Sequence, residues 1–345
     1  MLFGKMMLRF RIPLLILLGI VCLIFLFVIV VGGMLLFPAD AEPRGYAWTA
    51  DTQFSVSDHA VSVEMRDTSL RVMLLTDMHL IGVSDGRTGE LVRAMAERLN
   101  PDLIVLLGDQ CFTPFNLQAY GYLIALMDDV GIPWAPIYGN HDNFGDAQKN
   151  KLGSMLSESV SGLFQYGPQG MTGSGNYVLN IVKDAKSVHT FYLLDSHTTA
   201  ISDNPPVTAE QALWYEWAVK GIRTQAGGDV PSTVMLHVPL PEFVPAWQEA
   251  SDSGSVLYGE KREASCVPDK NTGLFDKMIE LGSTKGVFSG HDHLNNFSVT
   301  YKGIRLSYSN MSGYGSYGAD DMKGATLLTV NADGSTEQEL VFYKK

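Results

Sequence analysis

Short segments rich in aspartate, asparagine and histidine recur along the chain, and these side chains bind divalent metal ions and move protons. Five such segments carry the candidate chemistry: Asp77-Met-His79, Gly108-Asp109, Gly139-Asn-His-Asp142, His237 and Gly290-His-Asp-His293. Neutral imidazole nitrogens suit divalent transition metals, and aspartate adds a negatively charged oxygen ligand. Taken singly, Asp-x-His and Gly-Asp are common turn sequences. Their joint occurrence therefore indicates a metal-dependent site.

Each of these segments follows a short apolar run that predicts a buried strand. The runs are 71–76, 102–107, 133–138, 233–236 and 286–289. Uninterrupted apolar runs are typical of strands that are buried on both faces. Helical spacing predicts helices at 88–99, 117–130 and 208–221, the last with Thr208 as its N-cap. Strands that alternate with helices predict an α/β domain whose site lies on loops after the strand ends.

The five segments together resemble the calcineurin-like metallophosphoesterases, a superfamily of two-metal hydrolases, over about residues 72–317. The resemblance implies an α/β fold built as a two-sheet β-sandwich flanked by helices, a detail that the strand pattern alone does not fix. It also implies two divalent metal ions as cofactors, namely Mn, Fe or Zn. The first ion would be held by Asp77, His79, Asp109 and His293, and the second by Asp109, Asn140, His237 and His291.

This resemblance implies hydrolysis of a phosphoester. Two ions about 3.5–4 Å apart bind phosphate oxygens and lower the pKa of a shared water, and the bridging hydroxide then attacks phosphorus. Asn140 and His141 would contact substrate, with His141 stabilising the transition state or protonating the leaving oxygen. Asp142 would orient His141; alternatively, His141 is a turn residue that is hydrogen-bonded to Asp142.

The substrate class is less closely defined. A phosphomonoester is favoured over a phosphodiester because nothing in the sequence indicates a long groove for a polymer. The substrate could be a phosphorylated small molecule or a lipid head group at the membrane surface. The alternative from another functional class is a non-catalytic adaptor with the same fold.

Two departures separate the chain from typical purple acid phosphatases of this superfamily. His79 stands where they have glycine, and Phe112 stands where they have a tyrosine, three residues after the bridging aspartate. Without that phenolate, a coloured Fe(III) centre is not expected. The segments 259–263, 271–275 and 289–297 resemble a branch grouped only loosely with those enzymes. The loop Gly313-Tyr-Gly-Ser-Tyr-Gly318 is either a flexible lid whose tyrosines receive a substrate group or an ordinary glycine-rich loop.

The N-terminal region predicts a membrane anchor. Residues 12–37 carry no charge, and a helix of this length reaches about 39 Å, enough to cross a hydrocarbon core of about 30 Å. Lys5, Arg9 and Arg11 precede the run, which places residues 1–11 in the cytoplasm and the catalytic domain outside it. A cleaved signal peptide ending near Ala39-Asp-Ala41 is the alternative and would give a secreted protein. The expected organisation is an anchor at 12–37, a linker at 38–55 and a catalytic domain at 56–345.

Composition excludes several other classes of protein. Of the 345 residues, 46% are hydrophobic, which excludes intrinsic disorder. The overall charge is −12, but residues 40–345 carry 22 basic and 37 acidic residues, a net charge of −15. Such a domain repels polyanions, so no nucleic-acid partner is expected. Cys111 and Cys266 either pair or remain separate thiols, and the sequence leaves the oligomeric state open.

Overall fold

The computed structural model describes residues 20–21, 44–82, 86–113, 115–142, 146–197 and 204–344. Its contacts divide the chain into Met1–Ala41 and Glu42–Lys345. The predicted membrane segment, residues 12–37, lies outside the described residues except for Ile20 and Val21. Within the described ranges, no helix has both the length and the apolar character that a membrane crossing requires.

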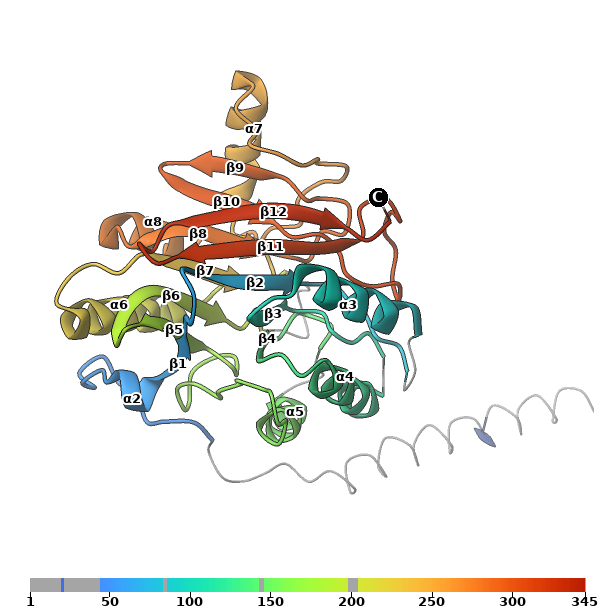
Figure 1. Cartoon of the computed structure of the whole chain (residues 1–345), viewed down its shortest axis with the longest axis horizontal. Helices are drawn as coiled ribbons and strands as arrows, with labels where there is room; N and C mark the ends of the chain where they lie inside the picture. The colour runs from blue at the N-terminus through green and yellow to red at the C-terminus, as the bar shows by residue number, and fades with distance from the viewer. Residues whose placement is uncertain are drawn as a thin grey trace, which may run out of the picture. The chain divides into compact units, whose positions relative to one another are not determined.

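Two β-sheets form the centre of the larger unit (Figure 1). One sheet has seven strands in the order β1-β5-β6-β7-β8-β10-β9, and the other has five in the order β12-β11-β2-β3-β4. The strands of the larger sheet are β1 (Ala60–Glu64), β5 (Tyr177–Lys183), β6 (Lys186–Leu194), β7 (Ser232–Leu236), β8 (Thr284–Ser289), β9 (Ser298–Tyr301) and β10 (Ile304–Tyr308). Those of the smaller sheet are β2 (Ser69–Leu75), β3 (Leu103–Leu107), β4 (Trp134–Ile137), β11 (Gly324–Asn331) and β12 (Thr336–Phe342).

Each sheet contains a block of parallel strands that bears candidate site residues. In the smaller sheet β2 pairs with β3 and β3 with β4, all parallel; in the larger sheet β6, β7 and β8 pair in the same way. Parallel strands direct their carboxyl ends to one edge of a sheet. The loops after β2, β3 and β4 therefore leave the same edge of the smaller sheet, and those after β7 and β8 leave one edge of the larger.

The strand β7 illustrates why the runs are apolar throughout. Met235 belongs to the hydrophobic core shared with the smaller sheet, whereas Val234 and Leu236 pack in a second core with α6, α7 and α8. Successive side chains of a strand point to opposite faces. Both faces of β7 are thus buried in hydrophobic cores, so apolar residues occur at successive positions of the strand.

Helices cover the outer faces of the sheets (Figure 1). The described helices are α2 (Val56–His59), α3 (Gly86–Leu99), α4 (Asn116–Val130), α5 (Asp146–Ser157), α6 (Ala209–Ala226), α7 (Phe243–Ser253) and α8 (Leu274–Leu281). Thr208 caps α6 in a reciprocal pair of hydrogen bonds with Gln211, as its sequence predicts. The predicted helices at 88–99, 117–130 and 208–221 correspond to α3, α4 and α6, and the two-sheet sandwich implied by the resemblance is confirmed.

The chain before β1 packs on α6. The indole of Trp214 donates a hydrogen bond to the hydroxyl of Tyr46, and that of Trp217 donates to the carbonyl of Thr52. Residues 44–55, the later part of the predicted linker, therefore contact the domain. Cys111 is buried and Cys266 is exposed, and both thiols are free.

Candidate metal centre

The loops that follow the parallel strands bring the predicted ligands together from both sheets. Asp77 and His79 follow β2, Asp109 follows β3, and Asn140 follows β4; His237 follows β7, and His291 and His293 follow β8. Two groups result, Asp77–His79–His293 and Asp109–His237–His291, and the ligand atoms in each group lie within 4.8 Å of one another. These two clusters are consistent with a dinuclear metal site.

In the first cluster, one oxygen of Asp77 is held and the other faces histidine nitrogens. Its Oδ2 accepts hydrogen bonds from the Thr76 hydroxyl at 2.8 Å and the His291 N–H at 3.0 Å. Its Oδ1 lies 3.3 Å from His293 Nε2 and 3.7 Å from His79 Nε2. The arrangement fixes the carboxylate and leaves one oxygen directed at the cluster.

Asp109 is arranged in the same way but faces both clusters. Its Oδ1 accepts the His141 N–H at 2.9 Å. Its Oδ2 lies 3.2 Å from His237 Nε2 in the second cluster and 3.7 Å from His79 Nε2 in the first. A single carboxylate oxygen between the two sets of nitrogens is the position that a bridging ligand occupies.

Hydrogen bonds on the far side of three of the imidazoles, those of His237, His291 and His293, set which ring nitrogen faces the cluster. Nδ1 of His237 donates to the Leu107 carbonyl at 2.8 Å, and Nδ1 of His293 donates to the Tyr317 carbonyl at 2.9 Å. In the neutral ring, Nε2 of each then carries the lone pair. His291 donates from Nε2 to Asn204 Oδ1 at 2.6 Å, which leaves Nδ1 as its acceptor nitrogen. Such bonds fix the tautomer and orientation of histidines that bind metals.

The backbone at the site is strained. Asp77, His79, Asp109 and His291 have φ angles of 53°, 46°, 53° and 78°. Non-glycine residues enter this left-handed region uncommonly, and strain of this kind gathers at functional sites. The strands on either side hold these residues in place, so the sharp turns direct their side chains towards the other sheet.

Burial makes the charges in the site interdependent. Asp77 and Asp109 are each 1% exposed. Burial alone would raise the pKa of both carboxyls, but the charge of His237 and hydrogen bonds from neighbouring histidines outweigh it and hold both pKa values well below their usual range. Burial would lower the pKa of His237, yet the charges of Asp109 and Asp77 raise it to about 10. The pair of carboxylates thus attracts positive charge strongly.

The donor set fits divalent ions. Ligands about 2.1 Å from a tetrahedral ion lie about 3.4 Å apart, which is close to the 3.2 and 3.3 Å between the facing carboxylate oxygens and imidazole nitrogens. The Nε2 atoms of His79 and His293 approach to 3.0 Å, and Nδ1 of His79 has no hydrogen-bond partner within the described ranges. Imidazole nitrogens this close together beside buried carboxylates form a donor set that a divalent cation can bind.

The remaining predicted residues lie around the second cluster. Asn140 is 5% exposed and next in sequence to His141, whose Nε2 lies 3.9 Å from Asp109 Oδ2. His141 is the most exposed of these groups, with 36% of its side chain open to solvent. Asp142 is buried, and its oxygens accept the N–H groups of Cys111 and Gly139. These contacts join the loops after β3 and β4; the catalytic assignment of Asp142 stays a prediction.

Sequence reasoning missed two groups that orient the ligands: Asn204, which contacts His291, and the Tyr317 carbonyl, which contacts His293. The Ser196 hydroxyl accepts the N–H groups of His237 and Val238. Ser196 follows the apolar run 191–194, and this strand-end position marks it in the sequence as a residue that could line the cleft. A backbone carbonyl has no recognisable spacing, and only the glycine-rich segment around it marks Tyr317.

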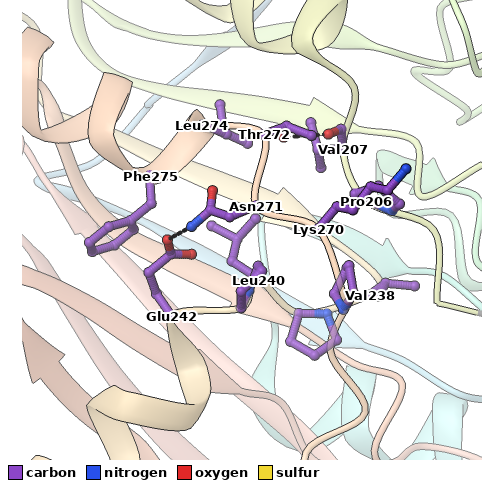
Figure 2. Close-up of a pocket in the computed structure, with 13 residues that line it drawn as sticks. Pro206, Val207, Val238, Leu240, Glu242, Lys270, Asn271, Thr272, Leu274 and Phe275 are labelled. Carbon is purple, nitrogen blue, oxygen red and sulfur yellow. Dashed lines mark hydrogen bonds between the residues drawn. The ribbon is translucent and has the colours of Figure 1, made fainter.

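A small cavity nearby is separate from the clusters. It holds about 10 Å³, room for about one water molecule, and lies between the loop after β7 and residues 268–275 (Figure 2). Asn271 donates to the Glu242 carboxylate on its wall, and Thr272 to the Val207 carbonyl. No candidate ligand lines it, so the chemistry lies elsewhere.

Comparison with known proteins identifies the family. A sequence profile of the calcineurin-like phosphoesterases matches residues 70–295. The chain therefore belongs to the calcineurin-like metallophosphoesterase family, and the two Asp/His clusters lie where such a centre is expected.

Individual relatives differ in what their names say of activity. The chain is 31% identical to a "Probable inactive purple acid phosphatase 14" of Arabidopsis thaliana, over 68% of this chain and 64% of that protein. It is 26% identical to "Phosphatase DCR2" of Saccharomyces cerevisiae, over 68% of this chain and 46% of that one. The chain thus spans less than two thirds of the length of each.

A solved structure supports the fold alone. The protein titled "GAP50 the anchor in the inner membrane complex of Plasmodium" superposes with a TM-score of 0.50 over 81% of this chain and 86% of that one, at 14% identity.

The close approach of Gly139 to Asp109 gives a test of the bridging position. A Cβ added at Gly139 would lie 2.1 Å from Asp109 Oδ1 and 2.4 Å from its nitrogen. Gly139→Ala should therefore displace Asp109 and weaken metal affinity by about tenfold or more, measured as bound Mn or Zn by mass spectrometry. Gly228→Ala is the matched control, because nothing lies within 4 Å of its added Cβ. Equal metal affinity in the two variants would contradict the geometry described for Asp109.

Proposed function

We propose that the chain is a dinuclear-metal-dependent phosphoesterase that hydrolyses phosphomonoesters. The observation that carries the proposal is Asp109 Oδ2, which lies within 3.2 Å of a nitrogen in one cluster and 3.7 Å of a nitrogen in the other. Asp77, His79, Asp109 and His293 are the proposed ligands of one ion, and Asp109, Asn140, His237 and His291 those of the second. Bound there, the ions would supply Lewis acidity to the phosphate oxygens and lower the pKa of a water.

The protein's own contribution is orientation and charge. The hydrogen bonds to the carbonyls of Leu107 and Tyr317 fix the orientation of the His237 and His293 rings before any substrate binds. Two buried aspartates and the surrounding core exclude bulk water, which strengthens every electrostatic interaction within the site. Asn140, beside His141, is placed to contact a phosphate oxygen.

His141 is the proposed acid or transition-state donor. Its backbone N–H is fixed on Asp109, whereas its side chain is more exposed than those of His79, His237 and His293. A partly open imidazole beside the centre can reach a substrate oxygen and donate a proton to the leaving group. The ring packs at 4.5 Å against Phe112, which limits its orientation.

A non-catalytic role is the second candidate, favoured by the word "inactive" in the name of the Arabidopsis relative. In this chain the six aspartate and histidine residues of the proposed ligand set lie together in two clusters. Retention of an oriented ligand set supports the enzyme over the adaptor.

Reloading with metal separates the two candidates. Purified protein reloaded with Mn, Zn or Fe(II) should bind close to two ions per chain. It should also hydrolyse p-nitrophenyl phosphate, and this activity is measured by the release of nitrophenolate. Asp109→Asn should lose both the metal and the activity, because it removes the shared charge. Two bound ions without hydrolysis of mono- or diesters would refute the enzyme, and no bound metal would favour the adaptor.

The role of His141 requires its own variant. His141→Ala should lower kcat by about 100-fold to 10,000-fold while metal content is unchanged, since the side chain is not a proposed ligand. Asp109 would still receive the backbone N–H of residue 141. Loss of metal from His141→Ala would assign the residue to metal binding instead.

We also propose that residues 12–37 tether this domain to a membrane, with residues 1–11 in the cytoplasm and the catalytic domain outside it. The support is the uncharged run and the basic residues Lys5, Arg9 and Arg11 before it. The full-length chain should stay in the membrane fraction after an alkaline carbonate wash, and protease added outside should degrade the domain. Release of the chain by the wash would instead indicate cleavage near Ala41 and secretion.

A further inference from the structure

The glycine-rich loop beside the centre is packed firmly on the first ligand segment. A Cβ added at Gly315 would lie 1.7 Å from the carbonyl oxygen of His79, so only glycine permits this approach. At the base of the loop the buried Lys323 donates to the Gly313 carbonyl at 2.6 Å. The N–H of Tyr314 donates to the Thr88 hydroxyl. These contacts describe a fixed loop and argue against a flexible lid.

The loop places the ring of Tyr317 on a ligand histidine. The rings of Tyr317 and His293 are stacked, with centroids 4.2 Å apart and planes 29° from parallel. The Tyr317 hydroxyl donates to Glu263 at 3.1 Å, and its carbonyl accepts from His293. The ring is thus held on one face, at its hydroxyl and through its backbone.

In spite of these contacts Tyr317 is 57% exposed, whereas His293 beneath it is only 6% exposed. One face of the tyrosine ring therefore covers the histidine, and more than half of the Tyr317 side chain is open to solvent. Exposed tyrosines are seldom fixed at so many points, because immobilising a surface side chain costs conformational entropy. A fixed and open aromatic face is suited to receiving another ring.

A second exposed ring contacts the other histidine of the pair. Phe112 is 48% exposed and packs edge-on against His79 at 5.6 Å and His141 at 4.5 Å. The rings of His79 and His293 are themselves 4.8 Å apart. Exposed aromatic rings therefore contact both histidines of the first cluster, and Phe112 also contacts the side chain proposed to reach the leaving group.

We propose that Tyr317 is a specificity-determining residue that stacks a planar aromatic group belonging to the substrate. The inference rests on the proposed function, because it takes the phosphate to lie at the metal centre. Stacked aromatic pairs contribute beyond the area that they bury, whereas an aliphatic group gains only from that burial. The aromatic group can be an aryl ester, whose ring is one oxygen atom from phosphorus, or a nucleobase, which a ribose separates from the phosphate; both offer a flat face.

Phosphonates that are not hydrolysed test the stacking independently of catalysis. Calorimetry of the metal-loaded, full-length protein should give a dissociation constant for phenylphosphonate that is about threefold to tenfold lower than that for methylphosphonate. Tyr317→Leu should abolish this preference, because leucine keeps apolar bulk but has no ring. Tyr317→Phe should retain it. Metal content, measured in each variant, should be unchanged.

Each outcome bears on the proposal. A preference for phenylphosphonate that survives in Tyr317→Leu would overturn the proposal. Equal weakening of both phosphonates in that variant would also overturn it, because a merely structural contact with His293 produces that result. Absence of phosphonate binding in the wild type would also overturn it. A ring preference that depends on Tyr317, in a protein that hydrolyses no phosphoester, would support the stacking role while refuting the proposed activity.

Hydrolysis then distinguishes the sources of the ring. If phenyl phosphate and adenosine monophosphate are both hydrolysed with kcat/KM above that of glycerol 3-phosphate, and Tyr317→Leu removes the advantage, a general aromatic preference is supported. An advantage confined to one of the two identifies aryl ester or nucleobase as the group. Glycerol 3-phosphate as the best substrate of all would contradict the inference.

Discussion

Burial of two aspartate carboxylates at the meeting point of two sheets is the constraint on which this structure depends. Asp77 and Asp109 are almost inaccessible to water, and an isolated buried carboxylate is strongly unfavourable unless hydrogen bonds and positive charge compensate it. Hydrogen-bond donors hold one oxygen of each residue. The other oxygen faces imidazole nitrogens and is placed to bind a cation, so a candidate metal site follows from the electrostatics of burial.

The fold supplies the rigidity that this arrangement needs. Four of the candidate ligand residues have left-handed backbone conformations. Such strained conformations persist only where the surrounding structure holds the backbone in place. Here parallel strands end immediately before the strained residues, and the strands are buried on both faces. The sandwich also supplies ligands from two directions, since Asp109 comes from the smaller sheet and His237 from the larger.

Two exposed aromatic rings contact the histidines of the first cluster. The ring of Phe112 packs against His141 and His79. The ring of Tyr317 is stacked on His293. A relative named inactive and a relative named a phosphatase are both similar in sequence to this chain, so the arrangement of side chains carries the functional argument.

The sequence by itself determined the class of fold, the order of strands and helices and the identity of the candidate ligands. Apolar runs such as that of β3 have no polar face, which identifies a strand covered on both sides, and the residues after each run are recognisable by type. Thr208 and Gln211 likewise identify the start of α6, because capping depends on local spacing. The net charge of residues 40–345 follows from composition alone.

Only the tertiary structure decided how these residues combine. The approach of His237 to Asp109 depends on how two sheets stack, and no local pattern encodes that distance. The Leu107 carbonyl and Asn204 orient ligands through contacts between residues far apart in the chain. The close approach of Gly315 to the His79 carbonyl and the hydrogen bond from Lys323 to the Gly313 carbonyl likewise arise only in the folded chain. Strand formation is a local consequence of residue order, whereas a metal site is a property of atoms that folding brings together.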